Sequence, residues 1–84
     1  MAKLYIVSTL SSGEVRAELD RQKVFTNKEK ANLFFKECYQ DLIKMVKGYE
    51  ILENENRKDY FHIQIDDDQG TVYVGEMRET EVIE

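Results

Sequence analysis

The sequence predicts an α+β fold in which one long amphipathic helix packs on one face of a mainly antiparallel sheet. Two observations lead to this prediction. Residues 26–48 repeat apolar side chains at helical spacing, and the flanking segments alternate apolar and polar residues as strands do. Turn residues separate the strands on both sides of the helix. The expected architecture is therefore a two-layer sandwich with the element order ββαβββ.

The helix is expected between Thr26 and Gly48. Its apolar residues lie one, three or four positions apart and form a single stripe: Ala31, Phe34, Phe35, Cys38, Leu42, Met45 and Val46. Thr26 followed by Glu29 fits a capping box, in which both side chains satisfy free N–H groups of the first turn. Lys44 and Lys47 suit the negative end of the helix dipole, and Gly48 can adopt the left-handed conformation that ends a helix.

Two strands are expected before the helix. Residues 3–9 are rich in β-branched and aromatic side chains and are apolar on both faces, which indicates a central strand. The Ser-Ser-Gly sequence at 11–13 supplies a turn. After this turn Val15, Ala17 and Leu19 alternate with charged residues, so we expect a second strand with one dry face, paired to the first as a hairpin.

Three strands are expected after the helix, at 49–53, 60–66 and 71–77. A polar loop at 54–59 separates the first two. The acidic sequence at 67–70 ends in Gly and predicts a tight turn between the last two strands.

Alternation along these strands predicts which side chains face the helix. Phe61, Ile63 and Ile65 are expected to point inward, and so are Val72 and Val74. A single helix covers about three strands, because packed layers lie ~10 Å apart. The other sheet face should therefore be partly bare. The candidate interface on that face comprises Tyr5, Val7, Tyr60, His62, Tyr73 and Met77, with Leu4 and Ile6 as the alternative to Tyr5 and Val7.

Length and composition predict one domain spanning residues 1–84, with residues 79–84 as a possible frayed tail. A hydrophobic content of 42% and a charged content of 35% are typical of a globular protein. The single cysteine excludes an internal disulfide and fits a reducing compartment. The apolar run near residue 1 is too short for a signal peptide, so we expect a cytoplasmic protein.

The segment at 24–35, VFTNKEKANLFF, ends a strand in Val-Phe-Thr and opens a helix rich in Lys and Glu. It resembles an element of small uncharacterised bacterial and phage α+β proteins. The resemblance covers about twelve of the 84 residues. It implies the same fold class, and it implies no shared activity because these proteins have none in common.

Cys38 and His62 are each the only residue of their type, which raises the hypothesis of a Cys–His nucleophilic pair. Cys38 belongs to the apolar helix stripe, where a thiol behaves as a small hydrophobic group. His62 is out of phase with the inward residues of its strand. The two side chains are therefore expected on opposite sides of the sheet, and the pair is not predicted to react.

The acidic turn invites comparison with a calcium-binding loop. Counting from Asp66, the fifth, sixth and twelfth positions are Gly70, Thr71 and Met77, whereas an EF-hand needs an acidic or amide residue, Gly and Glu there. The four glycines are too dispersed for a phosphate-binding loop. No metal, cofactor or catalytic residue is therefore predicted, and we expect the protein not to be an enzyme.

Charge is unevenly distributed along the chain, whose net charge is −5. Residues 1–48 carry nine Lys and Arg against six Asp and Glu, whereas residues 49–84 carry three against eleven. Outward tyrosines are typical of platforms for single-stranded nucleic acid, but phosphate binding needs a basic surface. Direct nucleic-acid binding is therefore not expected, and no segment indicates a membrane partner or a small-molecule substrate.

The leading functional hypothesis is a non-catalytic protein-interaction module that self-associates as a homodimer, or binds another protein, through the bare sheet face. Tyr and Met are enriched in interfaces, and two-fold dimers are the commonest assembly. The alternative is an acidic inhibitor that mimics nucleic acid and occupies a basic channel of a larger enzyme. Its contacts would be Glu50, Glu53, Glu55, Asp66, Asp67 and Asp68. A ligand-sensing regulatory domain is a third possibility, for which the sequence indicates no pocket.

Overall fold

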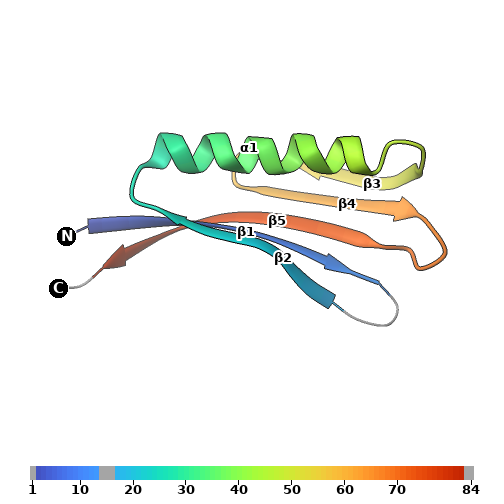
Figure 1. Cartoon of the computed structure of the whole chain (residues 1–84), viewed down its shortest axis with the longest axis horizontal. Helices are drawn as coiled ribbons and strands as arrows, with labels where there is room; N and C mark the ends of the chain where they lie inside the picture. The colour runs from blue at the N-terminus through green and yellow to red at the C-terminus, as the bar shows by residue number, and fades with distance from the viewer. Residues whose placement is uncertain (1, 14–16, 83–84) are drawn as a thin grey trace.

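The computed structural model describes residues 2–13 and 17–82. These residues form β1 (Ala2–Ser12), β2 (Ala17–Phe25), α1 (Lys28–Met45), β3 (Glu50–Asn56), β4 (Tyr60–Asp66) and β5 (Val72–Val82). One helix packs on a five-stranded antiparallel sheet, as Figure 1 shows. The predicted α+β class and the order ββαβββ are therefore confirmed.

The strands lie in the order β2-β1-β5-β4-β3, and every neighbouring pair is antiparallel. β1 and β5 form the longest ladder, which runs from the pair Ala2–Val82 to the pair Ser12–Val72. The first and last strands are therefore neighbours, and their outer ends meet at one end of the molecule (Figure 1). β2 and β3 are the edges of the sheet.

The helix begins one residue later than the capping box predicted. Asn27 is the N-cap, and its Oδ1 accepts hydrogen bonds from the backbone N–H groups of Glu29 at 2.8 Å and Lys30 at 3.2 Å. Asn is at least as good an N-cap as Thr because its side-chain oxygen reaches the same free donors. The predicted role of Thr26 is therefore wrong, although Glu29 lies in the first turn as expected.

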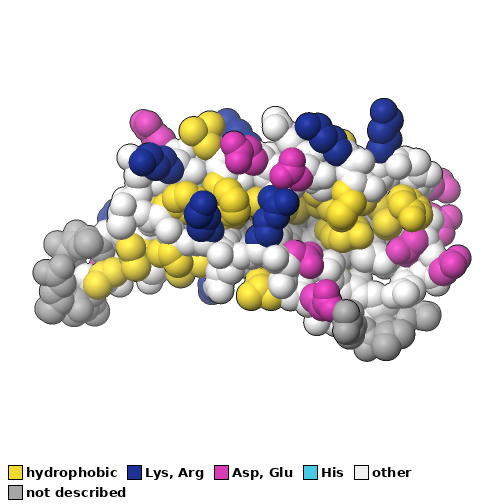
Figure 2. All heavy atoms as spheres, in the orientation of Figure 1, with side chains coloured by type: hydrophobic (Ala, Val, Ile, Leu, Met, Phe, Trp, Pro, Cys, Tyr) yellow, Lys and Arg dark blue, Asp and Glu magenta, His cyan; other side chains and the backbone are white. Residues whose placement is uncertain are grey.

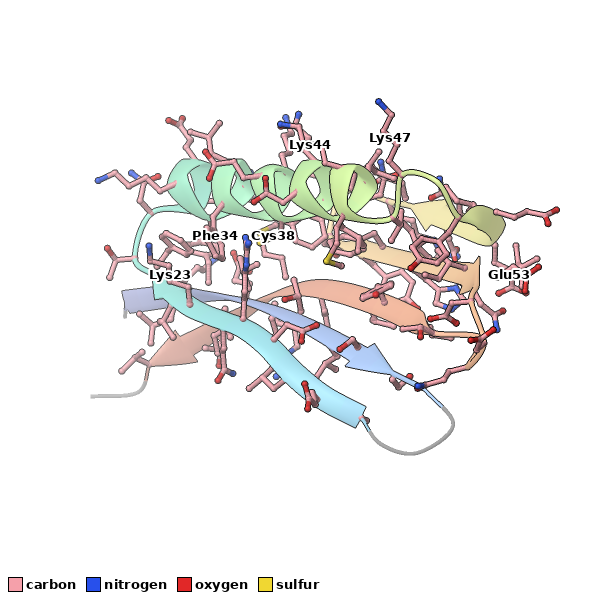
Figure 3. The ribbon with its side chains drawn as sticks, turned by 45° about the vertical axis from the view of Figure 1, so that its right-hand side comes forward. Lys23, Phe34, Cys38, Lys44, Lys47 and Glu53 are labelled. Atoms are coloured by element: carbon pink, nitrogen blue, oxygen red, sulfur yellow. The ribbon has the colours of Figure 1, made fainter. Side chains whose placement is uncertain are left out.

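The C-terminal end of the helix follows the prediction more closely. Lys44 lies in the last turn, and Gly48 has φ = 105°, a conformation that favours glycine. Both Lys44 and Lys47 point away from the sheet (Figure 3). Lys23, in contrast, extends from β2 towards the helix, and its Nζ lies 5.3 Å from the centre of the Phe34 ring.

The predicted helix stripe forms half of the core. Its buried members are Ala31, Phe35, Cys38, Leu42 and Val46. They pack against Phe61, Ile63 and Ile65 of β4, which point inward as predicted. Met45 departs from the stripe because it is 58% exposed at the end of the helix.

The orientation predicted for the last strand is wrong. Tyr73 and Met77 pack against the core, so Val72 and Val74 face away from the helix. The reason is Gly75, which is paired with Phe61 and lies beneath its ring. Residues at every second position of a strand share a face. Because Gly75 lies on the helix side, Tyr73 and Met77 lie on that side too.

The orientation predicted for the first strand is also wrong. Tyr5 packs against the core and Val7 is 0% exposed within it. Leu4 and Ile6, the alternative pair, therefore occupy the sheet face away from the helix. From Lys3 to Ser12, the residues of β1 other than Lys3 and Leu10 are half-buried or buried, which fits the prediction of a central strand.

β2 lacks the predicted dry face. Ala17 and Leu19 are both exposed, because they pair with Ser12 and Leu10 and so lie on the sheet face away from the helix. Val15, the third residue predicted on that face, lies outside the described residues. Pairing between β1 and β2 confirms the predicted hairpin, with a β-bulge where Thr9 pairs with Arg21 and Leu10 with Leu19.

Other boundaries differ from the prediction as well, and β1 continues to Ser12, through two residues of the turn expected at 11–13. β3 runs from Glu50 to Asn56, so it takes in half of the predicted polar loop. Residues 79–82, predicted as part of a frayed tail, continue β5 and pair with β1. Within 2–13 and 17–82, no helix is long and apolar enough to cross a membrane.

Candidate functional site

Two features of the described chain are candidate sites, and the first is the sheet face opposite the helix, here called the open face. Its apolar residues come from four strands: Leu4, Ile6, Leu10, Leu19, Val24, Tyr60, Val72, Val74 and Val82. Three of them are strongly exposed, with exposed fractions of 43% for Leu10, 55% for Leu19 and 54% for Val24. The open face thus presents two apolar clusters over β2, β1 and β5, which the polar row of Gln22, Ser8 and Glu76 separates.

Only two residues of the predicted interface, Tyr60 and His62, lie on the open face. The other four, Tyr5, Val7, Tyr73 and Met77, lie on the helix side. Alternation could have given the correct set for β5, had Gly75 been recognised as the partner of a large buried ring. Both faces of β1 carry apolar residues, so alternation alone cannot decide which face of this strand points to the helix. The orientation of β1 is decided by its contacts with the helix.

Polar groups interrupt the apolar area of the open face on β5 and border it along β3. Arg78 Nε and Glu76 Oε1 form an ion pair at 3.2 Å on β5. Along β3, Glu50, Glu53 and Glu55 pair with β4 residues of the same face, and Glu53 Oε2 lies 3.7 Å from His62 Nδ1. The open face is therefore apolar on the β2 side and acidic along the β3 edge.

Both edge strands carry features that oppose pairing with a further strand. β2 has a β-bulge at Asp20, and β3 has a register shift between Ile51 and Glu53. Bulges and charged side chains are common at sheet edges because they prevent edge-to-edge association. Both edges of the sheet are therefore poorly suited to pairing with a further strand.

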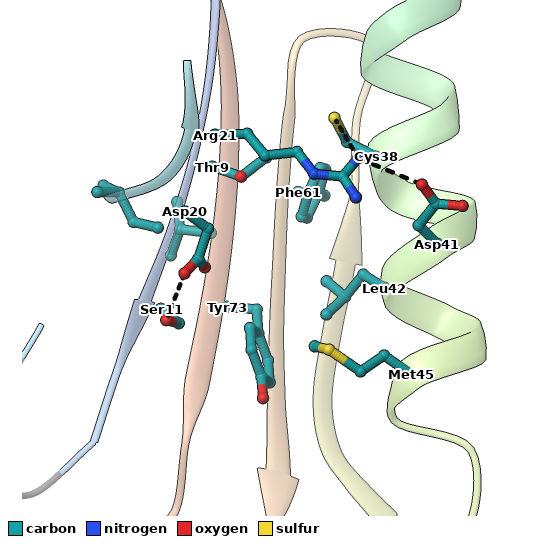
Figure 4. Close-up of a pocket in the computed structure, with 12 residues that line it drawn as sticks. Thr9, Ser11, Asp20, Arg21, Cys38, Asp41, Leu42, Met45, Phe61 and Tyr73 are labelled. Atoms are coloured by element: carbon teal, nitrogen blue, oxygen red, sulfur yellow. Dashed lines mark hydrogen bonds and ion pairs between the residues drawn. The ribbon is translucent and has the colours of Figure 1, made fainter. Parts of the chain in front are cut away.

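The second candidate site is a cavity of about 410 Å³ between α1 and β2, here called the helix-side cavity (Figure 4). Helix residues Cys38, Leu42 and Met45 form one wall. Phe61 and Tyr73 line it from the sheet. Figure 2 shows hydrophobic side chains gathered in a band below the helix, with Lys and Arg side chains lying across it.

Arg21 crosses from β2 to the helix at one end of this cavity. Its Nη1 donates to Asp41 Oδ2 at 3.2 Å and lies 3.8 Å from Cys38 Sγ. The β-bulge at Asp20 brings both Asp20 and Arg21 to the helix side, where Asp20 Oδ1 accepts a hydrogen bond from Ser11 Oγ at 3.1 Å (Figure 4). The rim of the cavity therefore holds one cation and two carboxylates.

Cys38 is buried in this wall and is 4% exposed. Burial raises the pKa of its thiol, and the hydrogen bond and charge of Arg21 oppose that shift only in part. The thiol is accordingly in its unreactive protonated form near neutral pH. His62 lies on the open face, so Cys38 and His62 are on opposite sides of the sheet, as the sequence predicted.

Tyr73 extends into the same cavity from β5 (Figure 4). Burial raises the pKa of its hydroxyl, and the negative charges of Asp67 and Asp20 raise it further. The hydroxyl therefore remains neutral at physiological pH.

The acidic turn after β4 has a structural explanation. Asp67 Oδ1 accepts hydrogen bonds from the backbone N–H groups of Gln69 at 3.1 Å and Thr71 at 2.8 Å. Gly70 has φ = 61°, as expected for the tight turn. Across the described chain, no three His, Cys, Asp or Glu side chains converge in a way that would hold a metal ion.

In comparisons with known proteins, no protein-family model, curated protein or solved structure matches the chain. Function must therefore be inferred from the two surfaces themselves. The helix-side cavity was not predicted from sequence, because its lining combines residues that are up to 65 positions apart, from Thr9 to Val74. The charged residues Asp20 and Arg21 gave no signal, since an alternating pattern places only one of them on each face.

Proposed function

We propose that this protein is a non-catalytic interaction module that associates with a second copy of itself through the open face. The observation that supports the proposal most directly is the exposed apolar side chains that β2 and β1 present on the open face, of which Leu10, Leu19 and Val24 are 43–55% exposed. Burial of apolar surface contributes roughly 25 cal/mol per Å². Pairing two open faces would remove these side chains from water.

The size of the open face fits a dimer. β1 and β5 each have 11 residues, which corresponds to ~36 Å at ~3.3 Å per residue. Five strands ~4.8 Å apart span ~24 Å, and the shorter strands reduce the area to roughly 700 Å². A standard interface buries about 800 Å² on each partner. The open face alone therefore supplies most of the area that a stable dimer needs.

The acidic β3 edge favours one arrangement of this dimer. A two-fold axis parallel to the strands places β3 opposite β2 of the partner, whereas an axis across the strands places β3 opposite itself. The second arrangement would bring two rows of glutamates together: Glu50, Glu53 and Glu55 from each chain. Like charges in contact are unfavourable, so the dimer should form about the axis parallel to the strands.

Sedimentation equilibrium of the whole chain tests this proposal. The unmodified protein should have the mass of two chains at tens of micromolar, and a Leu10→Glu variant should have the mass of one. Leu33→Glu is the matched control, because Leu33 is a comparably exposed leucine, at 61%, on the helix. A single-chain mass for the unmodified protein at ~100 μM would rule out the dimer.

A second candidate function is supported by the acidic edge itself. Glu50, Glu53, Glu55 and Asp66 lie on the same side of adjacent strands β3 and β4. Such a row suits the basic channel of a larger enzyme, in which the carboxylates would replace phosphates. The two functions differ in salt dependence: binding through the acidic row should weaken steeply with added salt, and an apolar dimer should be nearly insensitive to it.

A further inference from the structure

We propose that the helix-side cavity binds a small organic cation: an amine carried on an apolar body about as large as an aromatic ring. This inference goes beyond the proposed function, because it concerns the opposite side of the sheet from the open face. It rests on three independent properties of the cavity, namely its volume, its apolar walls and the charge of its rim.

The volume and the walls suit a small molecule. About 410 Å³ falls within the ~300–1,000 Å³ range of ligand pockets. Leu42 and Met45 contribute apolar surface from the helix, and the rings of Phe61 and Tyr73 face them from the sheet. Met45 is 58% exposed, and a flexible methionine side chain can move to accommodate a ligand.

The rim selects the charge of the ligand. Arg21 and Asp41 form an ion pair at 3.2 Å and so largely neutralise each other. Asp20 remains as an excess negative charge, and Asp20 Oδ1 accepts one hydrogen bond, from Ser11 Oγ. An ionised carboxylate has about four acceptor sites, so Asp20 can receive an ammonium group as well.

Tyr73 completes the site for a cation. Its hydroxyl is held in the neutral form and can accept a hydrogen bond, and the face of its ring attracts a nearby cation through its quadrupole. The negative potential that Asp20 and Asp67 create around Tyr73 would favour an amine and disfavour an anion of the same shape. Ligand charge is therefore the property on which the site should discriminate.

Isothermal titration calorimetry on the whole chain tests this inference with three probes of similar shape: 2-phenylethylamine, 2-phenylethanol and phenylacetate. The amine should bind about three- to fivefold more tightly than the alcohol, because only the amine carries the charge that the exposed Asp20 carboxylate attracts. Phenylacetate should bind least. Equal affinities for the amine and phenylacetate, or no heat with any probe at millimolar concentration, would overturn the proposal.

Two variants with the same change in net charge locate the site. Asp20→Asn should weaken amine binding about three- to fivefold, whereas Asp66→Asn, on the open face, should leave it unchanged. Ser11→Ala separates the charge from the hydrogen bond, because it removes the hydroxyl partner of Asp20 and keeps the carboxylate. This variant should retain amine binding. An equal loss in Asp20→Asn and Asp66→Asn would contradict the assigned site.

Amine binding at the helix-side cavity should be independent of self-association through the open face. The open-face variant Val24→Glu, which should also dissociate the dimer, leaves Asp20 and Tyr73 in place, and Val24 does not line the cavity, whereas Leu10 does. Amine binding should therefore persist in Val24→Glu at the affinity of the unmodified protein. Loss of amine binding in that variant, with its helical circular dichroism retained, would mean that the cavity depends on the dimer and would contradict two separate sites.

Discussion

The ring of Phe61 occupies the space that a side chain at Gly75 would need. The two residues are direct partners on β4 and β5, and a Cβ atom placed on Gly75 would overlap three carbons of the ring. Phe61 is 1% exposed, and its ring centre lies 5.3 Å from those of both Phe35 and Tyr39 on the helix. The missing side chain on β5 thus lets an aromatic ring fit between the sheet and the helix.

Gly75→Ala should therefore destabilise the protein by roughly 1–3 kcal/mol, the usual cost of an overpacked core. Urea unfolding followed by circular dichroism measures this change. Gly13→Ala is the matched control, because a Cβ there would meet the side chain of Gln69, which is exposed and can move. Equal losses of stability in the two variants would show that the contact with Phe61 is not the cause.

The identity of the helix cap can be tested with adjacent residues. Asn27→Ala should lower the free energy of unfolding by about 1 kcal/mol, because Glu29 and Lys30 lose the acceptor of their backbone N–H groups. Thr26→Ala should change it by less than half of that. The same urea experiment compares the two, and a larger effect at Thr26 would restore the capping box that the sequence predicted.

The turn at Asp67 should make stability depend on pH. The hydroxyl and the backbone N–H of Thr71 both donate to its carboxylate and hold the pKa of Asp67 below its usual range. A lowered pKa in the folded state means that the ionised group contributes stability above pH ~4, where the unfolded group is also ionised. That contribution is lost as the pH falls through the pKa of the folded state.

Asp67→Asn should consequently destabilise the protein at pH 6 and have a much smaller effect near pH 2.5. Urea unfolding at both pH values measures the difference. Asp68→Asn is the control, since Asp68 is the exposed next residue and the substitution changes the net charge equally. A destabilisation by Asp67→Asn that is the same at both pH values would contradict a role for the ionised carboxylate.

The burial of Cys38 predicts slow reaction with thiol reagents. Cys38 is 4% exposed, and burial raises the pKa of its thiol. Labelling with a chromogenic disulfide reagent at pH 7.5 should be at least tenfold slower in the folded protein than in urea. Equally fast labelling in both conditions would show that Cys38 is accessible from the helix-side cavity.

The elements whose apolar residues all fall on one face were predicted correctly from the sequence. β4 alternates without exception from Tyr60 to Asp66, and its bounds and orientation match the prediction. The stripe of α1 repeats over five turns, so its buried face was predictable even though its cap was not. Long, strongly periodic segments are determined by burial, whereas the exact end of a helix depends on a choice between two adjacent polar residues.

The errors occur where the sequence allows two orientations. Val72, Tyr73 and Val74 are all apolar, so local pattern cannot decide which of them faces the helix; the fit between Phe61 and Gly75 decides it. Arg21 contacts residues 17 and 20 positions away, and a β-bulge brings it to the helix side. Contacts of this range depend on how the layers pack, which the residues of one strand do not specify.

The central position of β5 has a consequence for how the chain folds. Residues 2–12 find their second hydrogen-bonded neighbour only in residues 72–82, so the sheet is completed by pairing the two most distant described strands. A high average separation between contacting residues slows folding, because a long loop must close first. The β1–β2 hairpin and the β3–β4 hairpin share no ladder of their own, and they remain unconnected until the last segment inserts between them.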